Sequence, residues 1–183
     1  YYPPVAIRDL RELCRYRISL ARSRAALKQR VHALVLRQGL DLPDVTDLFG
    51  QRGRRWLEAL TLPGWAGASL TGFLGLFDRF TGELERVARA VEAHAAADPI
   101  VVALRTLPGI GAVLGVTIRA EIGVIERFPD APHLASYAGL VPRVDTSGRR
   151  VRYGPLTKRG SVWLRWALTE AATHGLRRDD AVG

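Results

Sequence analysis

Two long stretches of the chain repeat hydrophobic residues every seven positions. The first runs without Gly or Pro from Arg8 to about Gln38, and its repeat consists of Leu13, Leu20, Leu27 and Leu34. The second runs from Ala68 to about Ala97, and its repeat consists of Leu70, Phe77, Leu84 and Val91. A heptad repeat predicts a helix whose hydrophobic stripe pairs with another helix. We therefore expect a long antiparallel helical hairpin, coiled-coil-like, with a connector over about residues 40–67.

Polar residues within the first stripe limit how tightly it can pair. Arg17 and Arg24 occupy positions on the stripe, and a charged side chain is a poor choice for a tightly packed dimer core. A loose or intramolecular pairing is therefore expected, with Gly39 ending the first helix. The connector mixes turn-forming residues with an apolar patch at 56–60, which predicts one short helix within it.

A boundary follows the second repeat. Pro99 comes directly after Asp98, and proline is accepted in the first turn of a helix but disfavours helix before it. We therefore divide the chain into a helical region, residues 1–97, and a second domain, residues 98–183.

The second domain is also predicted to be mostly helical. Its pattern predicts helices over residues 100–106, 112–122, 133–138 and 160–174. A turn signal between two runs that tolerate β structure predicts one short β-hairpin within residues 141–153. The fold class expected for the whole chain is mainly α.

The connection between the first two helices of this domain is rich in glycine. Its sequence is Leu-Pro-Gly-Ile-Gly, in which the glycines are Gly109 and Gly111. It resembles the helix-hairpin-helix element of DNA-repair and recombination proteins, in which amides at the start of the second helix bind a backbone phosphate. The alternative is a Gly-rich helix connection whose apolar residues pack in the core, and spacing alone leaves both open.

Basic residues exceed acidic ones and are concentrated in two segments. The chain has 27 Lys and Arg against 18 Asp and Glu, which gives a net charge of +9. Residues 1–40 carry a charge of +7, and residues 143–165 carry a charge of +6. Such an excess is typical of proteins that bind polyanions. Nucleic acid is the first candidate. An anionic membrane surface is the second, although the two heptad stripes favour pairing between helices.

Several classes of protein are excluded by what the sequence contains. Cys14 is the single cysteine and the four histidines are scattered, so neither an internal disulfide nor a metal site is predicted in this chain. No apolar run approaches the roughly 18–20 residues that span a bilayer, so we expect no membrane partner. The expected location is cytoplasmic, at the nucleoid. Because the chain starts at Tyr1 and lacks methionine, we expect it to be a fragment.

The second basic segment holds most of the candidate contacts to a phosphate-rich ligand. Arginine can grip phosphate through two hydrogen bonds, and glycine lets the backbone come close. The candidate contacts are Arg143, Gly148, Arg149, Arg150, Arg152, Lys158, Arg159 and Arg165. The alternative is a solvated basic face that binds nothing.

Ser147 lies inside this segment, between Thr146 and Gly148. A serine hydroxyl can attack a phosphodiester only if the phosphate charge is neutralised and the hydroxyl loses its proton. The neighbouring arginines meet the first requirement, whereas Asp145 is a weak candidate for the second. From this chemistry alone, Ser147 is better explained as a turn residue and Ser161 as a helix N-cap.

Several separated blocks of the sequence resemble one family. The blocks are Leu104–Gly111, Ala120–Gly123, Arg127-Phe128, Leu134–Arg143, Ser147-Gly148, Thr157–Gly160 and Leu164-Arg165. In content and order they closely resemble the C-terminal transposase domain of the IS110/IS116/IS902 insertion-sequence family, which is related to the Piv DNA invertase. This resemblance covers about residues 98–178, and the basic helix upstream is also similar to that of the family.

The resemblance implies a DNA transposase or site-specific recombinase. Family members join an N-terminal RuvC-like domain with four acidic metal ligands, absent from this chain, to a C-terminal domain that contributes a nucleophilic serine. Ser147 matches that serine. The resemblance also implies Mg²⁺ in the full-length enzyme, a structured guide RNA from the element in some members, and homo-oligomers formed through the helical hairpin.

Without the acidic domain, the chain alone is expected to be inactive in cutting DNA. Two other functions stay possible at this point. It could instead be a non-catalytic DNA- or RNA-binding module in which Ser147 only shapes a turn. It could also be a structural piece that only oligomerises through its heptads.

Overall fold

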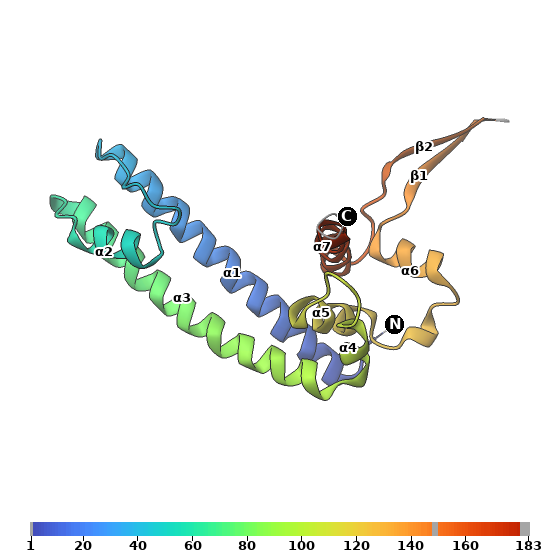
Figure 1. Ribbon diagram of the computed structural model, residues 1–183. Helices are drawn as coiled ribbons and strands as arrows, with labels where there is room; N and C mark the ends of the chain where they lie inside the picture. Colours follow the sequence, from blue (N-terminus) through green and yellow to red (C-terminus); the bar gives the residue numbers. More distant parts are fainter. Residues whose placement is uncertain (1, 148–149, 180–183) are drawn as a thin grey trace. The chain divides into compact units, whose positions relative to one another are not determined.

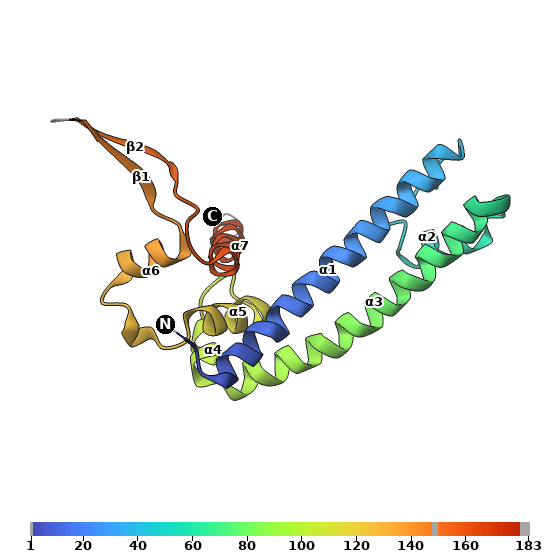
Figure 2. The ribbon, with the colours of Figure 1, turned by 180° about the vertical axis from the view of Figure 1, so that it is seen from behind.

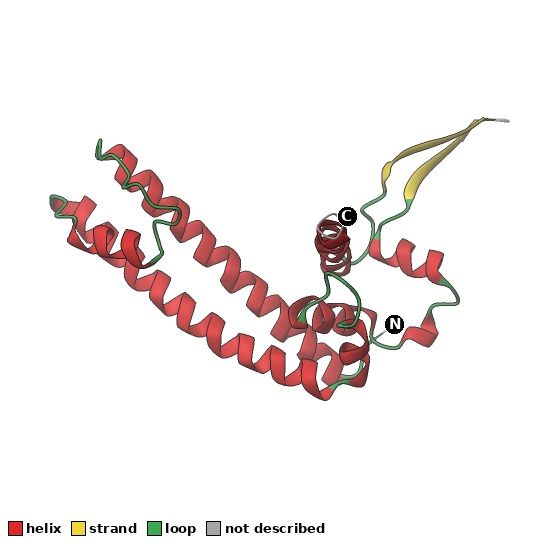
Figure 3. Cartoon of the chain, viewed as in Figure 1, coloured by secondary structure: helices red, strands yellow, loops and turns green. Residues whose placement is uncertain are grey.

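The computed structural model describes residues 2–147 and 150–179, apart from the side chains of residues 145–147, 150–151 and 177–179. The described chain is mainly α, as predicted (Figures 1 and 3). Its helices are α1 (Val5–Arg37), α2 (Gln51–Ala59), α3 (Gly64–Ala97), α4 (Pro99–Leu104), α5 (Ala112–Ile122), α6 (Ala131–Ala138) and α7 (Val162–Asp179), with a 3₁₀ turn, η1, at Ile125–Arg127. Strands β1 (Pro142–Ser147) and β2 (Arg150–Leu156) form an antiparallel pair, here termed the ribbon.

The chain divides into two compact units. The long-helix unit consists of Tyr16–Ala88, and the small-helix unit consists of Tyr1–Arg15 together with Arg89–Gly183. The predicted boundary at residues 97–98 coincides with the junction between α3 and α4. The compact units, however, divide inside α1 and α3, so two domains at residues 1–97 and 98–183 stay a prediction.

In the long-helix unit, α1 and α3 run antiparallel. The Tyr16 hydroxyl on α1 donates a hydrogen bond of 2.8 Å to Glu83, late in α3. Further along α1, Val31 is buried in one cluster with Leu70 and Leu74, which lie early in α3. The antiparallel helical hairpin predicted from the two heptad repeats is therefore confirmed.

The hydrophobic stripe of α1 is buried within this unit. Its leucines Leu20, Leu27 and Leu34 are buried, whereas the stripe positions Arg17 and Arg24 are half-buried. The intramolecular pairing that these arginines favoured is thus present. Association of several chains through the helical hairpin stays a prediction.

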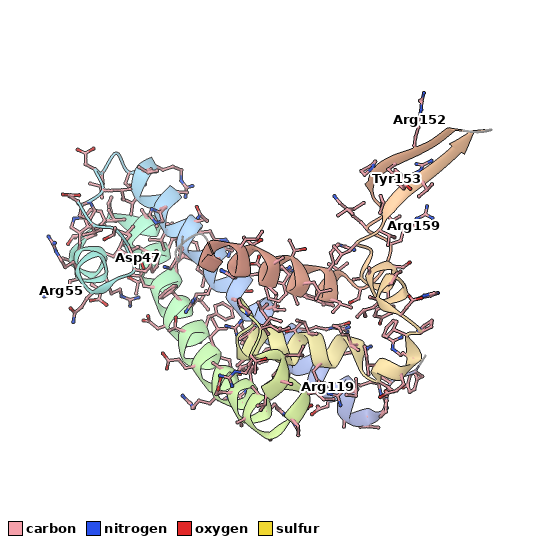
Figure 4. All side chains as sticks on the ribbon, turned by 45° about the vertical axis from the view of Figure 1, so that its right-hand side comes forward. Asp47, Arg55, Arg119, Arg152, Tyr153 and Arg159 are labelled. Carbon is pink, nitrogen blue, oxygen red and sulfur yellow. The ribbon has the colours of Figure 1, made fainter. Side chains whose placement is uncertain are left out.

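The connector between α1 and α3 is fixed by Asp47 (Figure 4). Its carboxylate accepts hydrogen bonds from the Phe49 backbone N–H at 3.0 Å and from Lys28 Nζ at 3.2 Å. These two hydrogen bonds, the first above all, lower the pKa of Asp47. The predicted short helix is confirmed as α2, whose Leu57 is buried in the core of the unit.

In the small-helix unit, three helices share one core. α4 begins at Pro99 and ends at Leu104, against the predicted range 100–106, and the Asp98 carboxylate accepts a hydrogen bond from the Ile100 N–H at 2.9 Å. The buried residues that join α5, α6 and α7 are Leu114, Ile118, Ala138, Leu164, Ala167 and Ala171. Helix α7 therefore packs against both α5 and α6, and the ribbon extends away from these helices (Figures 1 and 2).

Candidate nucleic-acid interface

The glycine-rich turn lies between α4 and α5, as predicted, but its two glycines have different surroundings. Gly109 has a φ of +83°, and a Cβ atom there would lie 2.7 Å from the Gly175 nitrogen of α7. Gly111 is exposed, caps α5 without a side-chain hydrogen bond, and would have no described atom within 4 Å of a Cβ. Gly109 is therefore explained by the close approach of α7. A phosphate contact for either glycine stays a prediction.

The base of the ribbon is held by backbone hydrogen bonds to α6 and the residues after it. The Thr157 N–H donates to the Val141 carbonyl and the Ser161 N–H donates to the Tyr137 carbonyl, each at 2.9 Å. Gly160 has a φ of +145°, and a Cβ there would lie 2.9 Å from the Tyr137 carbonyl carbon. Only glycine fits at position 160, where the backbone passes this close to Tyr137. This close approach sets where the ribbon leaves the helices.

Arg165, a predicted nucleic-acid contact, belongs to this anchor. It is half-buried, and its Nη1 donates a hydrogen bond of 3.2 Å to the Ala138 carbonyl. A Cβ at Gly139, which has a φ of +70°, would lie 2.7 Å from the same Nη1. The structure thus gives Arg165 a role in holding the end of α6, and its contact with nucleic acid stays a prediction.

The ribbon has two chemically different faces. Directly opposite residues of an antiparallel pair share a face, and successive residues alternate between faces. Among the residues whose side chains are described, Pro142, Val144, Tyr153 and Leu156 share one face, termed the apolar face; a register irregularity between Pro142 and Val144 leaves Leu156 opposite Pro142. The other face, termed the basic face, carries Arg143 and Arg152. A Cβ at Gly154 would lie 3.5 Å from the Arg143 Cβ, which agrees with this grouping.

Ser147, the predicted nucleophile, is the last residue of β1 and pairs with Arg150. The side chains of Ser147 and Arg150, and the whole of Gly148 and Arg149, lie outside the described residues. The register thus pairs Ser147 with a predicted phosphate contact, and the role of Ser147 stays a prediction.

The remaining candidate contacts surround the ribbon. Arg143 and Arg152 are exposed on the basic face. Lys158 and Arg159 follow the ribbon and are exposed, and Lys158 has a φ of +52°, which is uncommon outside glycine. Figure 4 shows Arg152 on the outer part of the ribbon and Arg159 nearer its base.

A buried carboxylate, which the sequence analysis did not single out, supports the start of α7. Glu121 of α5 is 3% exposed. It accepts hydrogen bonds from the Ser161 hydroxyl at 2.9 Å and from Arg15 Nη2 at 3.1 Å. The Ser161 oxygen in turn accepts the Leu164 N–H at 3.1 Å, which confirms Ser161 as the predicted N-cap. The available signal was an acidic residue within α5, a helix that is mostly apolar.

Arg11 adds to this contact between α1 and α5. Its Nε and Nη2 donate hydrogen bonds to the carbonyls of Ala120, at 2.8 Å, and Glu121, at 2.9 Å. These carbonyls belong to the last turn of α5, where backbone acceptors lack partners within the helix. Two arginines of the basic first segment therefore have structural partners inside the small-helix unit.

A stack of side chains connects η1 with α6. The Arg127 guanidinium lies 4.1 Å from the Phe128 ring centroid and 4.3 Å from that of Tyr137. Its Nε donates a hydrogen bond of 3.0 Å to the Ile122 carbonyl. These residues belong to the blocks that carry the family resemblance, and their contacts in the structure are with other residues of the same chain.

In the described part of the chain, no helix is long and apolar enough to cross a membrane.

Comparison with known proteins identifies the class. Residues 102–182 match the family described as Transposase IS116/IS110/IS902 family. The chain is 29% identical over 168 residues to a "Probable family 20 transposase" of Pseudomonas aeruginosa, covering 86% of this chain and 48% of that protein. It is 26% identical over 166 residues to the "Transposase for insertion sequence element IS1328" of Yersinia enterocolitica, covering 91% and 49%.

A third relative matches a shorter stretch more closely. Over 75 residues, the chain is 36% identical to the "Insertion element IS116 uncharacterized 44.8 kDa protein" of Streptomyces clavuligerus, covering 41% of this chain and 19% of that protein.

These matches place residues 102–182 in a family of insertion-sequence transposases. The family is IS116/IS110/IS902, to which residues 102–182 belong, so the resemblance found in the sequence is confirmed. The chain spans about half the length of the curated relatives that match most of it.

Proposed function

We propose that the chain is the serine-bearing part of a transposase acting as a site-specific recombinase. It would bind element DNA and supply Ser147 as the nucleophile for strand cleavage and exchange. The family of residues 102–182 supports this proposal. The structural observation that supports it is the ribbon register, which pairs Ser147 with Arg150. A phosphate bound by Arg150 would have its charge neutralised beside the strand partner of that arginine, Ser147.

The proposed reaction exchanges one phosphoester bond for another. The Ser147 oxygen attacks a DNA phosphorus, the bond from that phosphorus to one sugar oxygen breaks, and the freed oxygen takes up a proton. The Ser147 proton passes to a base. Attack on the serine ester by the hydroxyl of a second strand then joins the new DNA strand and returns Ser147. Because the number of phosphoester bonds is constant, the exchange needs no added energy source.

The Mg²⁺ that the resemblance implies does not fit this chain. Among the described residues, no three His, Cys, Asp or Glu side chains gather in a group that could hold a metal ion. We therefore assign no metal ligand here and derive no metal-dependent step. In the proposal, Mg²⁺ belongs to the RuvC-like domain of the full-length protein.

The exposed cations around the ribbon would position the DNA backbone. Arg143, Arg152, Lys158 and Arg159 would hold phosphates on either side of the reacting one, without reading sequence. The exposed N-terminus of α5 at Gly111 would hold another phosphate through its backbone amides. A guide RNA from the element would be a second ligand of these cations, and the long-helix unit would join copies of the protein.

Ser147 can be tested by trapping its covalent intermediate. The chain, joined to the RuvC-like domain of its full-length protein, is mixed with element-end DNA, element RNA and Mg²⁺ and then denatured. We expect a covalent protein–DNA adduct with the wild type and none with Ser147→Ala, because the alanine lacks the attacking oxygen. Ser136→Ala is the matched control, since Ser136 is exposed on α6, and it should form the adduct as well.

Two results would contradict the proposal. An adduct formed by Ser147→Ala would assign the nucleophile to another residue. DNA binding by all three proteins without any adduct would favour the non-catalytic binding module.

A further inference from the structure

The apolar face of the ribbon is exposed although its residues are of the kind that pack in cores. Tyr153 is 75% exposed, and Val144, which lies directly opposite it on β1, is 51% exposed. Leu156 on the same face is 44% exposed. A two-stranded ribbon is only marginally stable in water unless one of its faces is covered. A ligand that covers this face would therefore stabilise the ribbon.

We infer that the apolar face binds an unpaired nucleobase of DNA or RNA, which stacks on the ring of Tyr153. This inference rests on the proposed function, because it assumes that the basic face holds the phosphates of the same nucleic acid. An aromatic ring can stack on any base, since every base has a π face. The inference adds a second binding surface, distinct from the phosphate contacts and from Ser147.

The charge of the ribbon favours nucleic acid as the ligand of its apolar face. Residues 143–165 carry a charge of +6, and Arg152 is the sequence neighbour of Tyr153 on β2. Figure 4 shows both on the ribbon, farther from its base than Arg159. Because Arg152 and Tyr153 belong to opposite faces, a strand that contacts both passes over an edge of the two-stranded ribbon, with its phosphates at the cations and a base on the ring. Phosphate binding and base stacking then occur on one element.

A second copy of the chain fits this face less well. In the described part of the ribbon the face has two residue pairs, whereas a stable interface buries about 800 Å² on each partner, with about 20–30 residues a side. Pairing two ribbons would also bring together two segments that each carry a charge of +6. Like charges placed close together oppose association, whereas a nucleic acid neutralises them.

Stacking on Tyr153 requires a base that is not covered by its neighbours. In a continuous duplex, both faces of each base are occupied by adjacent base pairs, so a ring meets only base edges. In a single-stranded gap or a flipped nucleotide, one face of the base is free for the ring. Tyr153 should therefore contribute to the affinity for nucleic acid with unpaired bases and not to the affinity for a continuous duplex.

The test compares two DNA probes of equal length with the 183-residue chain. One is a continuous duplex, and the other has a single-stranded gap that contains the fluorescent base 2-aminopurine, whose emission falls when it stacks. We expect Tyr153→Ala to weaken binding to the gapped probe about 5- to 100-fold and to leave binding to the duplex within about twofold of wild type. Tyr153→Phe, which keeps the ring, should bind and quench the gapped probe as the wild type does.

Trp65→Ala serves as the matched control. Trp65 is also an exposed aromatic residue, 86% exposed, and belongs to the long-helix unit. Its replacement should change neither binding nor quenching. Because Tyr153 is exposed, its replacement should leave the far-ultraviolet circular dichroism of the protein unchanged, which shows that the variant is folded.

The outcomes separate this inference from the proposed function. If the wild type binds neither probe, the proposed function fails and the inference with it. If the wild type and Tyr153→Ala bind and quench the gapped probe equally, the inference alone is wrong. A dimer of the wild type that Tyr153→Ala abolishes in sedimentation would overturn it in favour of a second copy.

Discussion

At the scale of single residues, Glu121 joins segments that are far apart in the sequence. Its carboxylate accepts hydrogen bonds from Ser161, at the start of α7, and from Arg15 of α1. A buried charge is tolerated when it is paired and hydrogen-bonded, and the groups left behind become costly when it is removed. Glu121 therefore fixes the start of α7, which directly follows the ribbon and its anchor.

Replacement of this carboxylate should destabilise the small-helix unit. We expect Glu121→Ala to lower the free energy of unfolding by about 2–3 kcal/mol, because Ser161 and Arg15 both lose their acceptor. The loss in free energy of unfolding stays in this range because the Arg15 side chain is partly exposed to water, which can hydrate it after Glu121 is removed. Urea unfolding followed by circular dichroism measures the change. Glu126→Ala, at an exposed position, should remain within about 0.5 kcal/mol of wild type, and an equal loss in both variants would contradict the role of Glu121.

At the scale of elements, the turn between α4 and α5 is shaped by its packing on α7. Gly109 combines a positive φ with a backbone approach that leaves no room for a side chain. Gly111, two residues later, has extended backbone and open space at its Cβ position. The same short motif thus contains one glycine required by packing and one that is free of that requirement.

Substitutions at these two glycines should have opposite effects on stability. Gly109→Ala should lower the free energy of unfolding by about 2 kcal/mol or more, since it adds backbone strain to a steric conflict with α7. Gly111→Ser should raise it by a few tenths of a kcal/mol, because serine is a good N-cap for α5. Thermal and urea unfolding of the two variants make the comparison. Equal stability would show that the turn does not pack on α7 as described.

At the scale of the whole molecule, the excess of positive charge divides between different tasks. Arg11 and Arg15 of the first basic segment bond to α5, and Lys28 bonds to Asp47. The second segment instead places exposed cations on and beside the ribbon. Net charge alone therefore does not locate the nucleic-acid surface, whereas the exposure of the cations on and beside the ribbon favours that surface.

The contribution of the ribbon should be visible in the salt dependence of binding. We expect the double variant Arg149→Glu, Arg150→Glu to bind DNA more weakly, and the slope of log affinity against log salt concentration to become shallower by about 2, because two phosphate contacts are lost. The double variant Arg52→Glu, Arg55→Glu changes the net charge equally at exposed positions of α2. It should keep the wild-type slope, and unchanged binding by the ribbon variant would disprove the phosphate contact.

The elements that could be predicted from sequence are those set by neighbouring residues. The bounds predicted for α5, residues 112–122, are the observed ones, and the predicted N-cap Ser161 is confirmed. The heptad stripes likewise predicted the helical hairpin, because burial of a stripe requires only a second helix. The ribbon continues to Leu156, beyond the predicted end at residue 153, because β2 stays paired past its irregular register.

The features that sequence reasoning missed depend on distant contacts. Glu121 meets Arg15 across 106 positions of the chain, and the packing of Gly109 depends on α7. Arg165 was predicted to contact nucleic acid, yet its hydrogen bond to Ala138 could not be read from its basic neighbours. Local patterns give the type of residue at such positions, whereas the partner is set by the folded chain.

The discontinuous make-up of the small-helix unit has a consequence for the order in which the protein is synthesised. Its residues 1–15 are translated before Tyr16–Ala88, but the segment to which Arg11 and Arg15 bond is translated only after Tyr16–Ala88 is complete. The long-helix unit can thus form before the acceptors of these arginines have been synthesised. The small-helix unit therefore assembles after the long-helix unit, once the residues that follow Ala88 have been made.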